Sequence, residues 1–396
     1  MKILVLHQLP YSKAEYATAI DHVRHDVTYI GHPGRLADLP TGLRRTTIEV
    51  PAAEEFTEAV LARTHRTDGY HQVVSLSEFG ALAAPRVRAH LGLPGPGIDQ
   101  ALRTHDKVRM KEALTRAGIR CPRFAAAPPP AGGRLPWRGP TVLKPRRGTC
   151  SQGVAVCAGP AQALARLRAL PDPDAYQLEE YVEGHILHAD ALVVAGRPRH
   201  CVVSRYVGTP ARYAAGHPLG SVQLPSDQAR DAYVARVVDA LGITAGTVHL
   251  EFFETPDGER VFLEIANRMG GAGVVTAHLR HTGVHLPSYE IAALLGTAPP
   301  APRPPSGRHH GWLVVPGHSP GPGFRPAPGL PPALLEHRCV DRVHRPAPGT
   351  PPPTAVTYHE GQVPLALEVS HPDPAVLEDF LHTCAEALAP RQEAVA

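Results

Sequence analysis

The feature that most constrains this fold is the opening apolar strand and the alternation of strand and helix patterns that follows it. Residues 2–7 form a nearly continuous apolar run, which is typical of a parallel strand buried on both faces of a sheet. A helical pattern covers residues 53–66. Further strand-like runs occur at 27–30, 47–50 and 72–76. We therefore predict an α/β fold that opens with a small doubly wound domain over residues 1–100.

Clusters of glycine and proline divide the remaining chain, at 93–97 and in a Pro-rich linker at 298–308. With 396 residues, the chain is long enough for two or three domains of roughly 100–200 residues each. We predict an α+β second domain over 101–298 and a small α+β C-terminal domain over 309–396. The elements expected in these parts are helices at 104–117, 160–170, 227–241 and 373–389, and strands at 141–144, 176–194 (two, around Gly184), 246–253, 260–265, 311–315 and 364–369.

Charge and cysteine content restrict the classes of partner. The formal net charge is only +3 and no basic cluster occurs, so a nucleic-acid partner is not expected. The six cysteines form no CxxC pair, and free thiols in a reducing cytoplasm are the expected state. No stretch approaches the roughly 20 apolar residues of a membrane span. We expect a cytoplasmic protein with no membrane partner.

The first candidate site is a strand that ends in a cation and continues into a loop. Lys144 closes the strand, and glycines at 148 and 153 let backbone amides approach an anion closely. Thr149 and Ser151 add hydroxyl donors. The GxxxxGK[ST] spacing of a Walker A loop is absent. By itself this loop is compatible with polyphosphate binding and equally with a plain surface turn.

The second candidate site is a pair of carboxylates on a predicted hairpin with its turn at 256–258. Strand alternation would let Glu251 and Glu264 point to one face. The alternative is that both face solvent, but Glu264 lies among apolar neighbours, and a buried carboxylate needs a partner. Mg²⁺ prefers oxygen ligands of this kind. The pattern therefore favours a metal site.

Four segments carry a family resemblance through their order and spacing. They are His105–Lys107, Val142–Val154, Gln177–Gly184 and His249–Gly271. Together they resemble the ATP-grasp superfamily, and within it the carboxylate–amine and amino-acid (dipeptide) ligases. The resemblance covers about residues 1–300. It implies a pre-ATP-grasp domain, a two-lobed ATP-grasp domain with a lid subdomain at about 118–195, and a C-terminal domain that completes the substrate pocket.

The resemblance also implies roles for individual residues in binding ATP. Lys107 and Lys144 would bind the phosphates, the loop at 147–153 would fold over them, and residues 179–182 would form the hinge that grips adenine. The full set implied to bind the nucleotide is Lys107, Lys144, Arg147, Gly148, Thr149, Ser151, Gly153, Glu179, Glu180, Tyr181, Val182 and Glu183.

For the metal and the chemistry, the resemblance implies Mg²⁺, with Mn²⁺ as the alternative, on Glu251, Glu264 and Asn267. Arg268 and Lys144 would be catalytic, and Gly270 and Gly271 would leave room for the acceptor. Two positions depart from the family pattern. Ala266 stands where many members have an Asn ligand, so that Asn267 is displaced by one, and Ile186 stands where many have a ribose-binding Glu.

The implied function is an ATP-dependent ligase that joins a carboxylate to an amine through an acyl-phosphate and releases ADP and phosphate. Its partners would be small-molecule acids and amines, with amino acids in secondary metabolism such as antibiotic biosynthesis as the expected substrates, and a homodimer as the expected assembly. Two alternatives stay open: an ATP-grasp carboxylase or phosphorylating enzyme, and a catalytically reduced nucleotide-binding regulator.

Several further residues have two readings each. Arg205, Tyr206 and Arg212 could bind a substrate carboxylate or lie in a solvated loop. Glu78 could contact substrate at the end of a strand or cap a helix. Cys150 lies in the phosphate loop, but without a His/Asn constellation it is interpreted as a passive loop residue rather than a nucleophile. His188 is expected to line the pocket.

Overall fold

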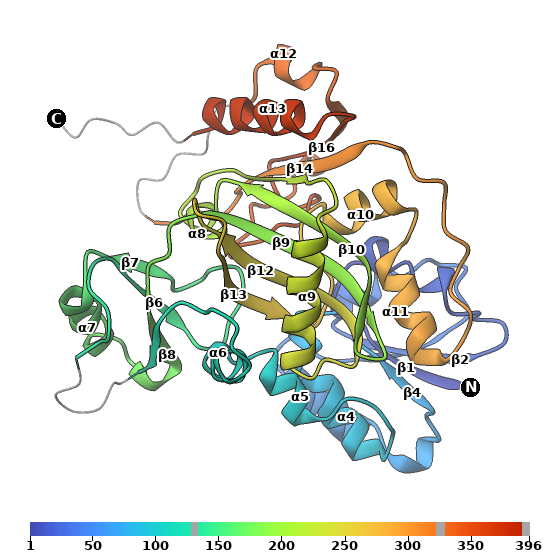
Figure 1. Ribbon diagram of the computed structural model, residues 1–396. Coiled ribbons are helices and arrows are strands. Elements are labelled where there is room, and N and C mark those ends of the chain that lie inside the picture. The colour runs from blue at the N-terminus through green and yellow to red at the C-terminus, as the bar shows by residue number, and fades with distance from the viewer. Residues whose placement is uncertain (128–133, 322–328, 390–396) are drawn as a thin grey trace.

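The computed structural model describes residues 1–127, 134–321 and 329–389, and it is built around three β-sheets (Figure 1). Parts of the predicted lid and C-terminal domain, at 128–133, 322–328 and 390–396, lie outside the described residues. The mixed α/β class predicted from the sequence is confirmed. Among the described residues, no helix combines the length and apolarity needed to cross a bilayer.

The N-terminal sheet is entirely parallel, with the order β3-β2-β1-β4. Alternate residues of its central strand are buried on opposite faces: Leu4 and Leu6 pack with α3 and α4, and Ile3 and Val5 pack toward α10 and α11. Burial on both faces explains why the first strand is apolar throughout. The four strands are β1 (Lys2–Leu6), β2 (Asp26–Gly31), β3 (Thr46–Glu49) and β4 (Gln72–Val74).

The central sheet is antiparallel and has the order β13-β12-β9-β10-β11-β14-β16-β15. Its last three strands come from the predicted C-terminal domain, which therefore joins the same sheet edge to edge through β11 and β14. Three of its strands, β10, β11 and β15, were not predicted from the sequence. The strands are β9 (His185–Val194), β10 (Arg197–Val207), β11 (Leu219–Gln223), β12 (Ala245–Glu254), β13 (Arg260–Ala266), β14 (His309–Val315), β15 (Val340–His344) and β16 (Leu365–His371).

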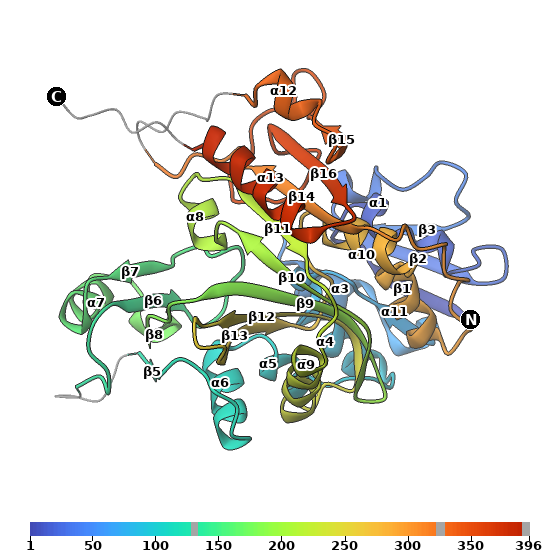
Figure 2. The same cartoon turned by 45° about the horizontal axis from the view of Figure 1, so that its top comes forward.

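A third, small antiparallel sheet stands to one side of the central sheet, at the left of Figures 1 and 2. Helix α7 packs on it over an apolar cluster that includes Trp137 and Leu178. We call this unit the lid sheet. Its strands, in the order β5-β8-β6-β7, are β5 (Phe124–Ala126), β6 (Thr141–Pro145), β7 (Ala155–Cys157) and β8 (Tyr176–Glu180).

Helices cover both faces of the two larger sheets. The predicted helix at 104–117 is in fact preceded by a separate helix, α5, and α6 begins only at Lys107, because the Asp106 carboxylate accepts hydrogen bonds from the amides of Val108 and Arg109. The α-helices are α1 (Tyr11–Ala14), α2 (Pro33–Leu36), α3 (Phe56–Arg63), α4 (Ala83–Leu91), α5 (Ile98–Arg103), α6 (Lys107–Arg116), α7 (Pro160–Arg168), α8 (Pro210–Ala214), α9 (Gln228–Ala240), α10 (Val274–Thr282), α11 (Leu286–Leu295), α12 (Pro332–Leu335) and α13 (Pro374–Ala387).

Alternation along β9 and β12 decides which side chains are available for chemistry. Leu187, Ala189, Leu250 and Phe252 point to one face, where they form a core with α6 and α9. The intervening residues of both strands therefore point to the opposite face. Those residues are His188, Asp190, His249 and Glu251. These four buried polar side chains therefore lie together on the face opposite to the apolar core.

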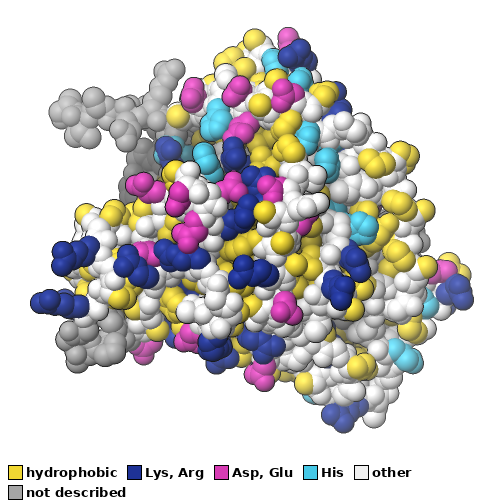
Figure 3. Space-filling view, in the orientation of Figure 1, with side chains coloured by type: hydrophobic (Ala, Val, Ile, Leu, Met, Phe, Trp, Pro, Cys, Tyr) yellow, Lys and Arg dark blue, Asp and Glu magenta, His cyan; other side chains and the backbone are white. Residues whose placement is uncertain are grey.

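The molecular surface in Figure 3 has mixed charge. On the face shown, Lys and Arg side chains are interspersed with Asp and Glu rather than gathered in one stripe. This matches the small formal net charge of +3.

Candidate active site

Two adjoining cavities meet at the polar face of the central sheet. The first, about 450 Å³, lies between the lid sheet and β12–β13, and we call it the lid cavity. The second, about 280 Å³, lies between the N-terminal sheet, the central sheet and residues 357–362, and we call it the domain cavity. The residues that line both are Lys107, Gly148, Thr149, Ser151, Pro210, Glu251 and Glu264. Three separately predicted segments thus converge at one junction.

The two predicted metal-binding glutamates face each other at this junction. Glu251 and Glu264 are direct partners in the register of β12 and β13. Lys107 Nζ lies 3.1 Å from Glu264 Oε2 and donates to the Gly148 carbonyl at 3.0 Å. Although burial alone would raise it, the pKa of Glu264 is lowered to about 2 by Lys107 and Lys144. Two adjacent carboxylates that line a cavity are suitable oxygen ligands for a divalent cation such as Mg²⁺.

One oxygen of Glu251 is held by two neighbouring side chains. The Tyr206 hydroxyl donates to Oε1 at 2.8 Å, and His249 Nε2 lies 3.4 Å from the same oxygen. Burial and the adjacent Glu251 raise the pKa of Tyr206 well above its usual value, so its hydroxyl keeps its proton. Both contacts fix the rotamer of Glu251 from the side of Oε1.

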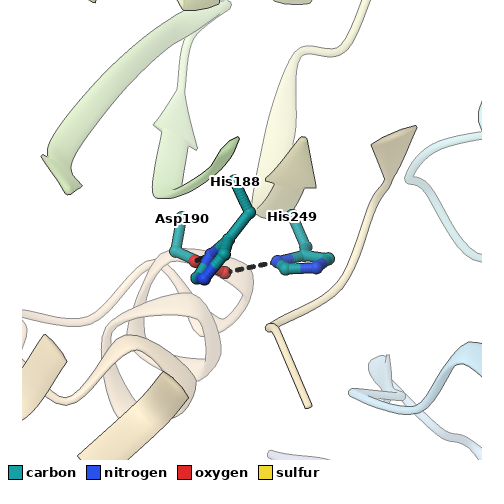
Figure 4. Close-up of side chains that lie close together, drawn as sticks. All are labelled: His188, Asp190 and His249. Carbon is teal, nitrogen blue, oxygen red and sulfur yellow. Dashed lines mark hydrogen bonds and ion pairs between the residues drawn. The ribbon is translucent and has the colours of Figure 1, made fainter. Parts of the chain in front are cut away.

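Behind Glu251 lies a buried chain of hydrogen bonds (Figure 4). His249 Nδ1 donates to Asp190 Oδ1 at 2.8 Å, and His188 Nδ1 donates to Asp190 Oδ2 at 2.6 Å. Ser221 Oγ lies 2.7 Å from His188 Nε2. Gly270 is required here, because a Cβ at that position would lie 2.6 Å from Asp190 Oδ1.

The charge in this chain is balanced. Burial alone would lower the pKa of His249, but Asp190 and Glu251 raise it to about 10. Burial alone would raise the pKa of Asp190, but His249 and His188 hold it far below its usual value. Two imidazoles and a carboxylate could also ligate a metal. However, each Asp190 oxygen takes a different ring nitrogen at hydrogen-bond distance, so we interpret the set as a support that orients His249 and through it Glu251.

A second buried charge cluster forms the floor of the lid cavity. Glu179 lies 2.5 Å from Lys111 Nζ and 3.0 Å from Lys144 Nζ, and all three side chains are almost fully buried. Burial alone would raise the pKa of Glu179, but the two ammonium groups hold it below its usual value. Burial lowers the pKa of Lys111 to about 8. Sequence analysis missed Lys111, because a lysine on a helix is ordinarily exposed to solvent.

The loop between β6 and β7 adopts an unusual backbone. Gly148, Cys150, Ser151 and Gly153 have φ values of 130°, 57°, 53° and 71°. Consecutive non-glycine residues in the left-handed region cost energy and occur mainly at functional sites. Such turns also expose neighbouring N–H groups to an anion. Burial raises the pKa of Cys150, which disfavours the thiolate that a nucleophile would need.

The predicted hinge residues all line the lid cavity, whereas some other predicted nucleotide contacts do not. Glu179, Glu180, Tyr181 and Val182 line the lid cavity, and so does Ile186. The Glu180 carboxylate is held by Arg120 at 2.8 Å and Arg123 at 2.5 Å. Three predicted nucleotide contacts are not among the lining residues of either cavity: Arg147, which pairs with Asp106, Gly153, which packs on Pro145, and Glu183, which is exposed.

Arg268 lies at the junction of the first domain and the central sheet. Its Nε and Nη2 donate to Glu78 Oε2 at 2.8 and 2.5 Å, and both side chains line the domain cavity. Burial alone would lower the pKa of Arg268, but Glu78 raises it. Of the two readings for Glu78, the structure favours a place in the cavity, since the helix-capping role is taken by Ser77.

Asn267 requires a correction. Its Nδ2 donates to the carbonyls of Thr247 at 2.8 Å and Ala245 at 3.3 Å, and it lines neither of the two cavities that contain Glu251 and Glu264. The predicted ligand role is wrong in this geometry, because no bulge follows Glu264 and the side chain one residue beyond Ala266 points to the other face.

Arg205, Tyr206 and Arg212, for which the sequence left two roles open, lie in different places. Tyr206 lies on β10 and lines the domain cavity, and Arg212 on α8 lines the lid cavity. Arg205 is adjacent in sequence but lies on the opposite face, where it pairs with Glu378 on α13 at 3.2 Å. This part of the chain is thus a strand rather than a solvated loop, and one of its side chains, that of Tyr206, lines a cavity.

Comparison with known proteins finds an amino-acid ligase that is related in sequence and further proteins that are similar in structure. No family model matches the chain. In an alignment of 223 positions, which spans 52% of this chain and 53% of the other protein, the chain is 27% identical to an L-arginine-specific L-amino acid ligase of Bacillus subtilis. An L-amino acid ligase from Bacillus licheniformis has a similar structure, with a TM-score of 0.71 and 18% identity, and the match covers 99% of this chain and 98% of the other.

A second solved structure is similar over a comparable length. Carboxyaminoimidazole ribonucleotide synthase from Aspergillus clavatus, complexed with ATP, gives a TM-score of 0.68 at 14% identity, and the match covers 98% of each chain. The curated relative is matched over about half of its length, and the structural matches at this identity establish the fold.

Proposed function

We propose that this chain, which has the fold of the ATP-grasp superfamily, is an ATP-dependent carboxylate–amine ligase that acts on amino acids. The observation that carries the proposal is the junction of the two cavities. There, Glu251 and Glu264 face each other beside Lys107 and the left-handed loop. A polyphosphate in the lid cavity and a carboxylate in the domain cavity would meet at this junction.

The lid cavity has the chemistry to hold ATP. Tyr181 and Val182 line one end, where an adenine would lie, and Lys144 and the 148–151 loop line the end that would receive phosphates. Glu251 and Glu264 would hold Mg²⁺ or Mn²⁺, which would supply positive charge to offset that of the phosphates. Lys107, which pairs with Glu264, would stay in contact with the phosphoryl group during its transfer.

The proposed reaction has two steps. A substrate carboxylate oxygen attacks the γ-phosphorus, and ADP leaves, which produces an acyl-phosphate. The amine nitrogen of a second substrate then attacks the carbonyl carbon, phosphate leaves, and the nitrogen loses a proton. Arg268 at the junction would stabilise the negative charge of the acyl-phosphate, and Lys144 that of the polyphosphate. Closure of the lid sheet would exclude water, which otherwise hydrolyses the intermediate.

The experiment that tests this proposal measures ADP and phosphate release from Mg-ATP with pooled amino acids, together with mass detection of amide products. Release that depends on amino acids, and a new amide, are expected. Glu264→Gln should lower turnover by about 10²–10³-fold, as removal of one electrostatic contact to a transition state typically does. Glu183→Gln is the matched control, because Glu183 is exposed and outside the lining of both cavities.

The same assay separates the alternatives. Bicarbonate-dependent ADP release without an amide would indicate a carboxylase. ATP binding without turnover in any pool would indicate a regulatory protein. Roles in secondary metabolism, a cytoplasmic location and a homodimeric assembly stay predictions from the sequence, and the ligation test does not depend on them.

A further inference from the structure

The part of the domain cavity that the lid cavity does not share has an apolar wall. Five side chains from separate elements form it: Tyr206 on β10, Leu219 on β11, Val274 on α10, Trp312 on β14 and Tyr358 in the irregular segment before β16. Leu219, Val274 and Trp312 belong to one buried apolar cluster, and the partly buried Tyr206 and Tyr358 pack against it. We call this set the apolar wall.

The backbone that follows Arg268 packs closely on this wall. A Cβ on Gly273 would lie 2.6 Å from the Trp312 side chain, and a Cβ on Gly271 would lie 3.8 Å from the Tyr358 ring. Tyr206 links the wall to the reacting groups, since its hydroxyl donates to Glu251 while its ring meets Trp312 edge-on at 6.2 Å. The apolar wall therefore begins where the proposed chemistry occurs.

The charged groups of the domain cavity are already neutralised within the chain. Lys13 pairs with Glu360 at 3.2 Å, Arg35 with Asp38 at 3.7 Å, and Arg268 with Glu78. Glu264 pairs with Lys107, and Glu251 is held by Tyr206 and His249. Among the described residues, the cavity thus offers no lysine, arginine or glutamate whose charge is free to pair with a charged substrate side chain.

These two properties decide which side chain the cavity favours. An arginine or lysine side chain placed on the wall would lose hydration without gaining a carboxylate partner, which is costly. A leucine, methionine or phenylalanine side chain instead gains free energy when it leaves water for an apolar surface. If a charged substrate side chain took a partner from an existing ion pair, one of the protein's own charges would be left without a partner.

We propose that the apolar wall is the subsite for the side chain of an amino-acid substrate, and that this side chain is uncharged and either aromatic or long and aliphatic. The inference rests on the proposed ligase function and specifies its substrate class. It sets this chain apart from the matched relative, whose name describes it as specific for L-arginine.

The test is a specificity profile of the full-length protein. Leucine, methionine and phenylalanine are compared with arginine, lysine and glutamate by ADP release and by the mass of the amide. We expect kcat/KM to be at least about 10- to 100-fold higher for the apolar group, the range that a difference of 1.4 to 2.7 kcal/mol produces. Equal or better use of arginine or glutamate would overturn the inference while leaving the ligase function intact, whereas no amide from any amino acid would remove the function itself.

A pair of variants tests the wall directly. Tyr358→Ala should lower kcat/KM for phenylalanine by about 10-fold, mainly through KM, and should leave the KM for ATP unchanged, because Tyr358 does not line the lid cavity. Leu219→Glu, if folded, should admit lysine or arginine; ATP binding reports whether it has folded. Val343→Ala, on an exposed position of β15, is the control. A Tyr358→Ala loss that is equal for apolar and charged amino acids would contradict the subsite.

Discussion

The lid cavity and the domain cavity meet at the same pair of glutamates but are built in different ways. The lid cavity is formed mainly from a few continuous segments, around 107, 142–156, 179–186 and 251–264. The domain cavity combines short runs that follow N-terminal strands, at 8–10 and 76–79, with residues from β10, β11, α10 and β14 and from 357–362. Under the proposed function, nucleotide binding would depend mainly on local motifs, whereas substrate selection would depend also on how distant elements pack.

Outside the domain cavity, two buried glutamates are held in different ways. Glu179 beneath the lid cavity has two ammonium partners. Glu290 on α11 has a hydrogen bond from Thr247 at 2.5 Å and no ion pair among the described residues. Glu179 therefore keeps its charge by pairing, whereas burial favours the neutral form of the Glu290 carboxyl group.

The largest effect should come from breaking the charge cluster of the lid cavity. Glu179→Gln would leave Lys111 and Lys144 buried without a counter-charge, so the free energy of unfolding in urea should fall by about 3–5 kcal/mol. Glu180→Gln on the same strand is the matched control. Its partners Arg120 and Arg123 are 39% and 55% exposed, so the loss should be about 1 kcal/mol or less. Equal losses would mean that the cluster is not distinct from a surface pair.

Glu290 should contribute to the pH dependence of the free energy of unfolding. Burial raises the pKa of Glu290 to about 7. A folded-state pKa above the unfolded value stabilises the protein fully at low pH, and this contribution is lost as the pH rises through about 7. Stability should therefore fall by roughly 3 kcal/mol between pH 4 and 8 from this group alone. Glu290→Gln should remove that part of the slope in pH-dependent urea titrations, and an unchanged slope would refute the assignment.

The junction between the cavities can be tested through its cation. His249→Asn removes the support for Glu251 Oε1 and should weaken Mn²⁺ binding by about 10- to 100-fold, as loss of groups that orient metal ligands typically does. Electron paramagnetic resonance of free Mn²⁺ measures this without turnover. His382→Asn, on an exposed position of α13, should bind Mn²⁺ like the parent protein. Unchanged affinity in His249→Asn would show that Glu251 needs no such support.

The smallest effect should lie at the outer edge of the domain cavity. Glu360, beside cavity residue His359, pairs with Lys13, and the two side chains are 32% and 16% exposed. A partly exposed pair contributes up to about 1 kcal/mol, so Glu360→Gln should raise the KM for the amino acid two- to fivefold. The KM for ATP should stay constant in steady-state assays. A parallel rise in both values would mean that the two cavities are not separable.

Several features of the site could be predicted from the sequence because they depend on neighbours along the chain. The hairpin and the common face of Glu251 and Glu264 follow from strand alternation. The same alternation places Asn267 on the face opposite to Glu264, so its predicted role as a metal ligand was wrong. Strands β10 and β11 were not predicted because polar residues, such as Arg205 and Ser221, interrupt their apolar pattern. Both strands are defined by pairing with neighbouring strands, and the sequence does not show that pairing.

What the sequence alone determined is the type of its most regular elements, the parallel start of the chain and the local chemistry of the lid cavity. Hydrophobic period and loop composition act over a few residues, and they set each element and its face. What only the tertiary structure decided is which faces meet. Lys111 pairs with Glu179, Arg268 with Glu78, and Trp312 reaches Tyr206, across 68, 190 and 106 positions respectively. Such pairings follow from packing of whole sheets and helices, which no local pattern contains.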